Sequence, residues 1–383
     1  MGEPMGEQLH DSAVIKAAAE FAQAKIAPIA AELDEEGRAP TELFEEMAQL
    51  GFFGMRYPKE LGGKGLSATE SYFAVSELAK ASAGVALLVE VHWMAIDALL
   101  KFGSEEQKAR WIPDLLSGKR IAAYTISEAC AGSDAAGITT VAEKVEGGYR
   151  LNGAKYFSTN GGVADLYVIA AKTDPEAGGK GISVFVVDID TPGFRTSPNI
   201  QKLGCRSSEM TALSFKDCFV PAENLVGAEN GGFKAAMYGL VGGRVGMVAM
   251  GLGIASAALD SAAAYANRRM AFGAALAKMP AVQSMVAEMH VKVETIRHML
   301  LAVTEKMDRG EDVSLDSSTA KIAAAEAVNE VCHKALQIHG GHGYIKGNAT
   351  ERYYRDGRLM DIGVGASEVL KSVVGGSVLR SYK

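Results

Sequence analysis

The sequence predicts an α+β protein in which a small β domain separates two helical domains. Apolar residues recur three and four positions apart from residue 11 to about residue 116, and again after residue 231. Between about residues 121 and 230 they alternate instead, in runs bounded by Gly, Pro, Asn or Asp. The 383 residues also exceed one ordinary core, since single cores stop growing near ~250 to 300 residues. We therefore expect three domains, over residues 1–120, 121–230 and 231–383.

The N-terminal domain is predicted to be helical. Segments 12–33 and 41–54 both repeat apolar residues at helical spacing, and the second segment follows Pro40. A glycine-rich loop over residues 58–65 interrupts this pattern, and another helix is expected to begin near Ala68.

The middle and C-terminal domains differ in the period of their apolar residues. Strands are expected where the period is two, as in segments 148–161, 166–174, 181–190 and 211–220. Long helical patterns return after Gly231, spaced like the helices of an antiparallel four-helix bundle.

The composition argues against nucleic-acid, membrane and metal partners. The net charge is −7 and the basic residues are scattered, which is not typical of a nucleic-acid or anionic-membrane surface. The four cysteines have no CxxC spacing, so neither a zinc site nor a disulfide framework is indicated, and a reducing compartment fits best. No apolar run is expected to reach the ~18 to 20 residues of a membrane span, and residues 1–12 lack the pattern of a signal peptide. We expect a cytoplasmic protein.

Five motifs follow one another along the chain: YTISEACAGSD at 124–134, NGAKYFSTNG at 152–161, RMAFG at 269–273, QIHGGHGY at 337–344 and Arg355-Asp356. One AGSD or GGHG motif alone is more typical of a surface turn. The five together, in this order and over nearly the whole chain, resemble the acyl-CoA dehydrogenase family. The resemblance implies the acyl-CoA dehydrogenase fold, noncovalent FAD and an acyl-CoA substrate.

The resemblance assigns cofactor contacts to the first two motifs. A flavin needs neutral donors and acceptors at its pyrimidine edge and cationic or backbone N–H partners at its pyrophosphate. Ser127 matches the position that faces the pyrimidine, and Ser133 one near the phosphate and the substrate. Phe157 and Thr159 match the pair that covers the ring, and Tyr124 begins the first motif. Each could instead be an ordinary strand or turn residue.

The later motifs imply a cofactor shared between chains. Arg269 matches an arginine that reaches the pyrophosphate of a neighbouring subunit, and Gln337, Gly340 and Gly341 match the loop along the adenosine. We therefore expect a homotetramer. Arg269 could otherwise be a solvated cation at a helix C-terminus, which the helix dipole favours.

The end of the site departs from the family. Ala366 and Glu368 stand where relatives carry a Thr-x-Gln pair, so we expect weaker or different adenosine contacts there.

The usual catalytic base is predicted to be missing. In the family, a glutamate in a Tyr-Glu-Gly-Thr segment removes the proton α to the thioester, and the matching residue here is Val364. Some members carry the base one residue before the arginine that matches Arg244, and that residue is Gly243. Losing a general base typically costs ~10² to 10⁴ in rate. Arg244 itself matches an arginine near the acyl-CoA, where substrate or a carboxylate should meet it.

A relocated base is expected on the helix over residues 86–101, which matches the family helix at the acyl end. Glu90, Met94 and Asp97 lie three or four residues apart and therefore share one face. We predict Asp97 as the base in apolar surroundings, with Glu90 as second choice and Met94 and Val364 beside the substrate. The alternative is a solvated face on which Asp97 pairs with Lys101, worth only ~0.2 to 0.5 kcal/mol.

A base remote from the thioester suits an already unsaturated substrate, whose γ proton is acidified through the conjugated system. This pattern is similar to the cyclohex-1-ene-1-carboxyl-CoA dehydrogenases of anaerobic aromatic metabolism, a family branch that lacks the usual glutamate. It implies 1,4-elimination on an alicyclic acyl-CoA, and family membership implies electron-transfer flavoprotein as the acceptor.

Three other functions remain open at this point. A flavin monooxygenase on the same fold would also lack the glutamate. A non-catalytic subunit of a heteromeric dehydrogenase would fail to bind flavin alone, and an acyl-carrier-protein-dependent relative would use CoA thioesters poorly.

Overall fold

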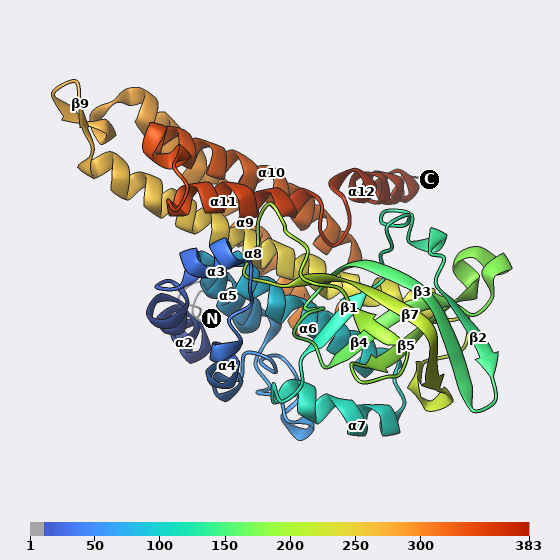
Figure 1. The fold of residues 1–383 in the computed structure, drawn as a ribbon. Helices are drawn as coiled ribbons and strands as arrows, with labels where there is room; N and C mark the ends of the chain where they lie inside the picture. Colours follow the sequence, from blue (N-terminus) through green and yellow to red (C-terminus); the bar gives the residue numbers. More distant parts are fainter. Residues whose placement is uncertain (1–10, 383) are drawn as a thin grey trace.

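The computed structural model, which describes residues 11–382, has helices, then a β sheet, then long helices (Figure 1). The predicted α+β fold class is therefore confirmed. The N-terminal helices are α2 Ala13–Phe21, α3 Ala30–Glu36, α4 Phe44–Leu50, α5 Ala68–Ala81, α6 Ala83–Phe102 and α7 Glu105–Leu116. Helix α5 starts with a capping box, in which the Ser67 hydroxyl accepts from the backbone N–H of Glu70 and the Glu70 carboxylate accepts from the backbone N–H of Ser67.

Helix α6 is the centre of the N-terminal domain. It is apolar on all sides, and a helix of that kind is stable only when other elements surround it. Helix α5 and the long helix α8 pack against it, and strand β1 follows close by. The side chains of α6 therefore lie where the three domains meet.

The middle domain is an eight-stranded sheet in the order β6-β7-β3-β2-β4-β5-β8, with β1 parallel to β4. The strands are β1 Ala122–Thr125, β2 Val141–Val145, β3 Gly148–Thr159, β4 Leu166–Lys172, β5 Ile182–Asp188, β6 Phe194–Thr196, β7 Met210–Pro221 and β8 Leu225–Val226. Successive residues of β4 pack alternately into two different hydrophobic cores, one on each face of the sheet. Leu166 and Val168 face the helices, whereas Tyr167 and Ile169 face a smaller core on the other side of the sheet.

The C-terminal domain is built on three long helices, α8 Gly232–Arg268, α9 Pro280–Asp308 and α10 Ser314–His339. They pack on one another along most of their length. A short hairpin, β9 Met270–Ala271 with β10 Ala274–Ala275, joins α8 to α9, and α11 Ala349–Gly357 and α12 Ser367–Ser381 follow α10. The hairpin lies at one end of the molecule and the sheet at the other (Figure 1).

Two helices correct the expectation that no segment is long and apolar enough to span a membrane. Ala83–Phe102 and Gly232–Arg268 both pass that test by length and composition. Their most apolar windows are 89% and 83% buried inside the protein, as is usual for core helices. Charged residues such as Glu90 and Asp97 in the first helix and Arg244 in the second interrupt the apolar runs in the sequence, but they do not prevent the helices from being buried.

Candidate functional site

Unpartnered hydroxyls and an exposed aromatic ring gather at the end of strand β3. Tyr156 donates its backbone N–H to the carbonyl oxygen of Ser127 at 2.9 Å, so these two motifs lie side by side. The β3–β7 pairing is irregular between Lys155 and Ser158, and Phe157 takes a left-handed φ of 60°. An irregularity of this kind turns a side chain out of the strand pattern. The Phe157 ring is 54% exposed, which is unusual for so large an apolar group.

These groups fit a flavin. In the described part of the chain, the hydroxyls of Ser127, Ser133 and Thr159 have no hydrogen-bond partner, so they are free to serve a polar ring edge or a phosphate. The Phe157 ring, two residues before Thr159, offers an exposed apolar face. Tyr124 differs, because its hydroxyl donates to the carbonyl oxygen of Ala236 at 2.7 Å and is thus already used by α8. Its cofactor role stays a prediction.

A buried ion pair positions the loop that carries Ser127 and Ser133. Lys155 donates to Glu128 at 2.8 Å, and the same carboxylate accepts backbone N–H bonds from Thr139 and Thr140. Burial acts to raise the pKa of Glu128, but Lys155 and the hydroxyl donors lower it to about 2. The carboxylate is therefore ionised at all ordinary pH values and keeps the loop against β3. No motif in the sequence indicates this pair.

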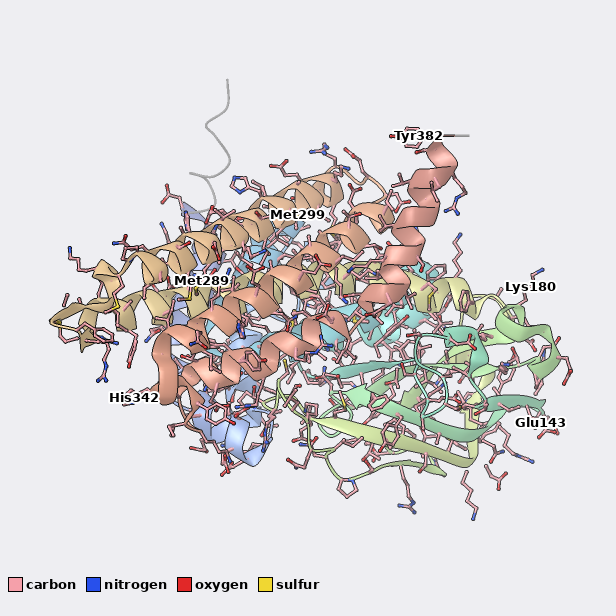
Figure 2. All side chains as sticks on the ribbon, turned by 90° about the horizontal axis from the view of Figure 1, so that it is seen from above. Glu143, Lys180, Met289, Met299, His342 and Tyr382 are labelled. Atoms are coloured by element: carbon pink, nitrogen blue, oxygen red, sulfur yellow. The ribbon has the colours of Figure 1, made fainter. Side chains whose placement is uncertain are left out.

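Four of the other predicted cofactor residues, Arg269, Gln337, Gly340 and Gly341, lie at the opposite end of the molecule, whereas Ala366 and Glu368 lie at the start of α12. Arg269 and Gln337 are exposed, as are Gly340 and Gly341. Figure 2 shows His342, in the same glycine-rich loop, at one end of the molecule and Lys180 and Glu143 of the β domain at the other. The two groups therefore lie at different ends of the molecule, and the sharing of one cofactor between two chains stays a prediction.

Helices α6 and α8 form a close antiparallel seam beside Val364. A Cβ atom added at Gly243 would lie 2.8 Å from Met94 Sδ and 3.0 Å from Val364 Cγ1. One turn further along α8, a Cβ atom at Gly246 would overlap the Glu90 carboxyl. We call the residues Glu90, Met94, Gly243, Gly246 and Val364 the α6–α8 seam. Among them, Met94 and Val364 were expected beside the substrate, and Glu90 was the second choice of base.

Asp97 is not in the apolar surroundings that we expected. Arg56 Nη2 donates to Asp97 Oδ2 at 2.6 Å, and the Tyr57 hydroxyl donates to Asp97 Oδ1 at 3.0 Å. The guanidinium also lies 5.1 Å from the Trp93 ring centroid. An ion-paired carboxylate of this kind is a poor base, because proton uptake would leave Arg56 as an unpaired buried cation. The sequence could not indicate this, since Arg56 lies 41 positions away.

Glu90 has the free carboxyl that was expected of Asp97. Its side chain is 3% exposed and its Oε1 atom has no hydrogen-bond partner. Burial raises the pKa of Glu90 well above its usual range, Arg56 offsets part of that shift, and Asp97 adds to it. The alternative of a solvated face is wrong for this helix. Lys101 forms no ion pair with Asp97 and lies instead over the Tyr238 ring, 5.8 Å from its centroid.

Arg244 meets no carboxylate within residues 11–382. Its Nη1 atom donates to Ser318 Oγ at 3.4 Å, and its buried Nε atom has no partner. Burial lowers the pKa of Arg244. We expected either a carboxylate or the substrate to meet Arg244, and no carboxylate in residues 11–382 does so.

Glycines in an apolar helix were the signal that could have located the seam. A glycine inside a helix costs about 1 kcal/mol relative to alanine, so Gly242, Gly243 and Gly246 need a packing reason. Each of them makes room for a side chain from another element. At Gly242, an added Cβ atom would lie 2.6 Å from Asp97 Oδ2.

Known proteins are similar to this chain over nearly its whole length. Profiles of the acyl-CoA dehydrogenase N-terminal, middle and C-terminal domains match residues 10–119, 123–218 and 230–379. A short-chain specific acyl-CoA dehydrogenase of Clostridium acetobutylicum is 40% identical over 94% of this chain and 96% of the relative. The mitochondrial short-chain specific acyl-CoA dehydrogenase of Mus musculus is 39% identical over 95% of this chain and 89% of the relative.

Solved structures share the fold. Butyryl-CoA dehydrogenase from Megasphaera elsdenii has a TM-score of 0.95 and 36% identity, covering 99% of this chain and 100% of that chain. The same values hold for a chain in a structure described as an electron transferring flavoprotein of Acidaminococcus fermentans. A structure described as PigA with FAD and proline has a TM-score of 0.93 and 27% identity, covering 99% of both chains.

Proposed function

The chain belongs to the acyl-CoA dehydrogenase family, an FAD-dependent enzyme family, and from this premise we propose that it oxidises a cyclic, already unsaturated acyl-CoA by 1,4-elimination. A suitable substrate is cyclohex-1-ene-1-carboxyl-CoA. The observation that carries the proposal is the placement of carboxyl groups. Residue 364 is a valine, and the free carboxyl of Glu90 lies elsewhere in the α6–α8 seam.

Glu90, rather than Asp97, is the proposed base. The side chains of Met94 and Val364 both lie against Gly243. Glu90 is one helical turn from Met94, about 6 Å along the axis of α6. A base at that position is suited to removing a proton from a carbon beyond the α carbon of the acyl group. Asp97 lies on the other side of Met94 and already accepts hydrogen bonds from Arg56 and Tyr57.

The proposed reaction balances without any further reactant. The γ C–H bond breaks, the proton goes to the Glu90 carboxylate, and the electron pair forms a double bond to the β carbon. The electrons of the original α,β double bond form a new double bond between the α carbon and its other ring neighbour. A hydride leaves that neighbour, and bound FAD would supply its acceptor. Ser127, Thr159 and Phe157 would hold the flavin, and Ser133 its phosphate side. The product is a conjugated cyclic diene.

Burial of Glu90 sets the expected pH dependence. Because burial raises its pKa, the Glu90 carboxyl is expected to keep its proton to a higher pH than an exposed glutamate does. Oxidation requires the ionised form, so its kcat/KM should rise with pH until Glu90 has ionised. The reverse reaction, reduction of the diene, uses the protonated form and should be favoured at lower pH.

Replacing Glu90 by glutamine tests the base directly. Glutamine has nearly the same shape and cannot accept the proton, so Glu90→Gln should lose roughly 10² or more in turnover of cyclohex-1-ene-1-carboxyl-CoA. FAD content and thioester affinity should stay close to wild type, and the rise with pH should disappear. The measurements are anaerobic flavin reduction and identification of the product.

Asp97→Asn is the companion variant. It removes the charge that pairs with Arg56, so some loss of stability is expected, but the pH profile should keep its rise. If Glu90→Gln turns over normally and Asp97→Asn is inactive, the base is Asp97 as the sequence first predicted. Normal turnover by both variants would rule out the relocated base.

We also propose a homotetramer that acts in the cytoplasm and passes its electrons to electron-transfer flavoprotein. Large apolar side chains support a contact with another chain at the hairpin end, where Phe272 is 97% exposed and Tyr344 is 82% exposed. Arg269 and the glycine-rich loop lie at the same end (Figures 1 and 2). The similarity to a chain in a structure described as an electron transferring flavoprotein supports the acceptor.

A further inference from the structure

Arg56 is a cation held among aromatic rings next to α6. Its side chain is 12% exposed, and its guanidinium carbon lies 4.8 Å, 5.4 Å and 5.1 Å from the ring centroids of Tyr57, Tyr72 and Trp93. The faces of such rings attract a cation that is largely removed from water. Burial acts to lower the pKa of Arg56, but the partner carboxylate of Asp97 raises it overall to well above its usual range. The guanidinium therefore keeps its charge and its position.

The glycine-rich loop over residues 58–65 holds the backbone beside Arg56. Gly65 donates its backbone N–H to the carbonyl oxygen of Tyr57 at 2.8 Å. A Cβ atom added at Gly63 would lie 2.2 Å from the same oxygen, so this close approach requires glycine. The loop that interrupts the helical pattern therefore fixes Arg56 against α6.

Two glycines of α8 show how close Arg56 lies to Glu90. A Cβ atom added at Gly242 would lie 3.5 Å from Arg56 Nη2, and one added at Gly246 would lie 1.8 Å from Glu90 Oε2. Because Cβ atoms four residues apart on a helix are about 6 Å from each other, the guanidinium lies within about 11 Å of the Glu90 carboxyl. Charges that are largely buried still interact at this distance, since little water screens them. The charge of Arg56 therefore reaches the proposed base.

Arg56 and Asp97 are the charged groups that act on Glu90 within residues 11–382. Burial raises the pKa of Glu90, the charge of Arg56 lowers it, and the charge of Asp97 raises it. The phenols of Tyr57 and Tyr72 lie beside these groups, and burial raises the pKa of both, so they stay neutral at ordinary pH. The two opposed charges therefore determine how readily Glu90 ionises in its buried position.

The other elements that pack on α6 direct their polar groups elsewhere. Arg244 of α8 donates to Ser318 of α10. His92 lies two residues from Glu90 and therefore on the opposite side of α6, where its ring bonds to backbone groups of α7 and β1. Burial lowers the pKa of His92 to about 4, so its ring is neutral. Burial also raises the pKa of Tyr124 in β1, whose hydroxyl donates to a carbonyl oxygen of α8.

We propose that Arg56 is a positioning residue for the proposed reaction, a fixed cation that stabilises the carboxylate form of Glu90 against the opposing charge of Asp97. The inference rests on the proposed function in taking Glu90 as the base. A charge that is already in place favours the carboxylate without having to reorient. Because Arg56 pairs with Asp97 and not with Glu90, the Glu90 carboxylate stays free to accept the proton. Arg56 should therefore extend the activity of the enzyme toward lower pH.

Arg56→Gln in the Asp97→Asn background tests the charge without leaving an unpaired carboxylate. Infrared titration of the FAD-loaded protein, without substrate, follows the C=O stretch of the protonated Glu90 carboxyl, which Glu90→Gln identifies by its loss. Asp97→Asn alone should move the titration midpoint to lower pH than in wild type. The added Arg56→Gln should move it about one pH unit above that of Asp97→Asn, a tenfold smaller ionisation constant. Equal midpoints in these two variants would overturn the proposal.

Two controls separate the charge of Arg56 from a merely structural role. Arg56→Lys in the Asp97→Asn background keeps the cation, so its midpoint should stay close to that of Asp97→Asn. Arg309→Gln, at an exposed ion pair with Glu311, should leave the wild-type midpoint unchanged.

The double variant also keeps the test decisive if Asp97→Asn does not fold. It has neither charge, and its midpoint should lie above that of wild type, because Arg56 acts on Glu90 more strongly than Asp97 does. A midpoint at or below the wild-type value would contradict the proposal.

The pH dependence of kcat/KM with cyclohex-1-ene-1-carboxyl-CoA separates this inference from the proposed function. If Glu90 is the base, the midpoint of the activity profile should shift in each variant as the infrared midpoint does. Infrared midpoints that shift while the activity profile stays in place would uphold the action of Arg56 on Glu90 and show that another group is the base.

Discussion

Two carboxyl groups on α6 illustrate how environment separates residues that look equivalent in sequence. Glu90 and Asp97 lie on the same helix in an equally apolar run, and both are largely removed from solvent. Arg56 and Tyr57 satisfy Asp97, whereas one oxygen of Glu90 has no partner. A carboxyl that is buried and unpaired is a better candidate for proton transfer than one fixed in an ion pair. The difference comes from residues about forty positions earlier in the chain.

Val364 carries a second prediction at this scale. We expect wild type to reduce its flavin slowly with butyryl-CoA, because no carboxylate stands where the family removes the α proton. Val364→Glu should speed that reduction by tenfold or more. Glutamate is not β-branched and therefore tolerates the left-handed φ of 55° better than valine.

The matched control for that experiment is Val364→Gln, which has the same shape without the base. Stopped-flow flavin reduction under anaerobic conditions measures both variants. Wild-type turnover of butyryl-CoA at the rates of ordinary short-chain relatives would show that the proton has another acceptor and that the lost-base argument fails.

Helix α8 determines where the seam can hold polar groups. Its glycines let α6 approach closely, and Gly246 is the position where an added methyl group would overlap the Glu90 carboxyl. We therefore predict that Gly246→Ala displaces Glu90, lowers stability by about 1 to 3 kcal/mol and reduces turnover of the cyclic substrate to nearly the level of Glu90→Gln.

Rescue distinguishes this positioning role from simple overpacking. Glu90→Asp in the Gly246→Ala background shortens the side chain by one methylene, so it should restore stability measured by thermal unfolding. Gly375→Ala in α12 is the control, since an added Cβ atom there meets nothing within 4 Å, and alanine should stabilise that helix slightly. If Gly246→Ala is as active as wild type, Glu90 does not need its present position.

The elements show which parts of the fold could be predicted from sequence. Period and turn residues were enough for the helix, strand, helix order, because strands such as Gly148–Thr159 and Ile182–Asp188 alternate clearly. The short motifs also assigned flavin contacts to the hydroxyls of Ser127 and Thr159, and these assignments stay predictions. The Glu128–Lys155 and Arg56–Asp97 pairs were not, because each joins residues far apart in sequence, and periodicity contains no information about such contacts.

At the scale of the whole molecule, the chain separates two groups of predicted cofactor residues. Ser127 and Thr159 belong to the β domain, and Arg269 and Gln337 lie at the far end of the long helices (Figure 1). The length of α8, 37 residues, accounts for this separation, since a helix rises about 1.5 Å per residue. If all of these residues bind FAD, each cofactor must lie between two chains.

Arg269→Ala tests that arrangement. Removing one charge-assisted contact with a phosphate costs about 1.5 to 3 kcal/mol, so the Kd for FAD should rise by roughly ten- to a hundredfold. Arg268→Ala is the matched control, because Arg268 is exposed in the same turn of the chain and is assigned no role.

Because each flavin is expected to bridge two chains, loss of FAD from Arg269→Ala should also weaken the tetramer, which sedimentation velocity measures over a range of protein concentrations. Added FAD should restore assembly. A wild-type protein that stays a flavin-loaded monomer at micromolar concentration would contradict the shared site and would require Arg269 and Gln337 to serve some other partner.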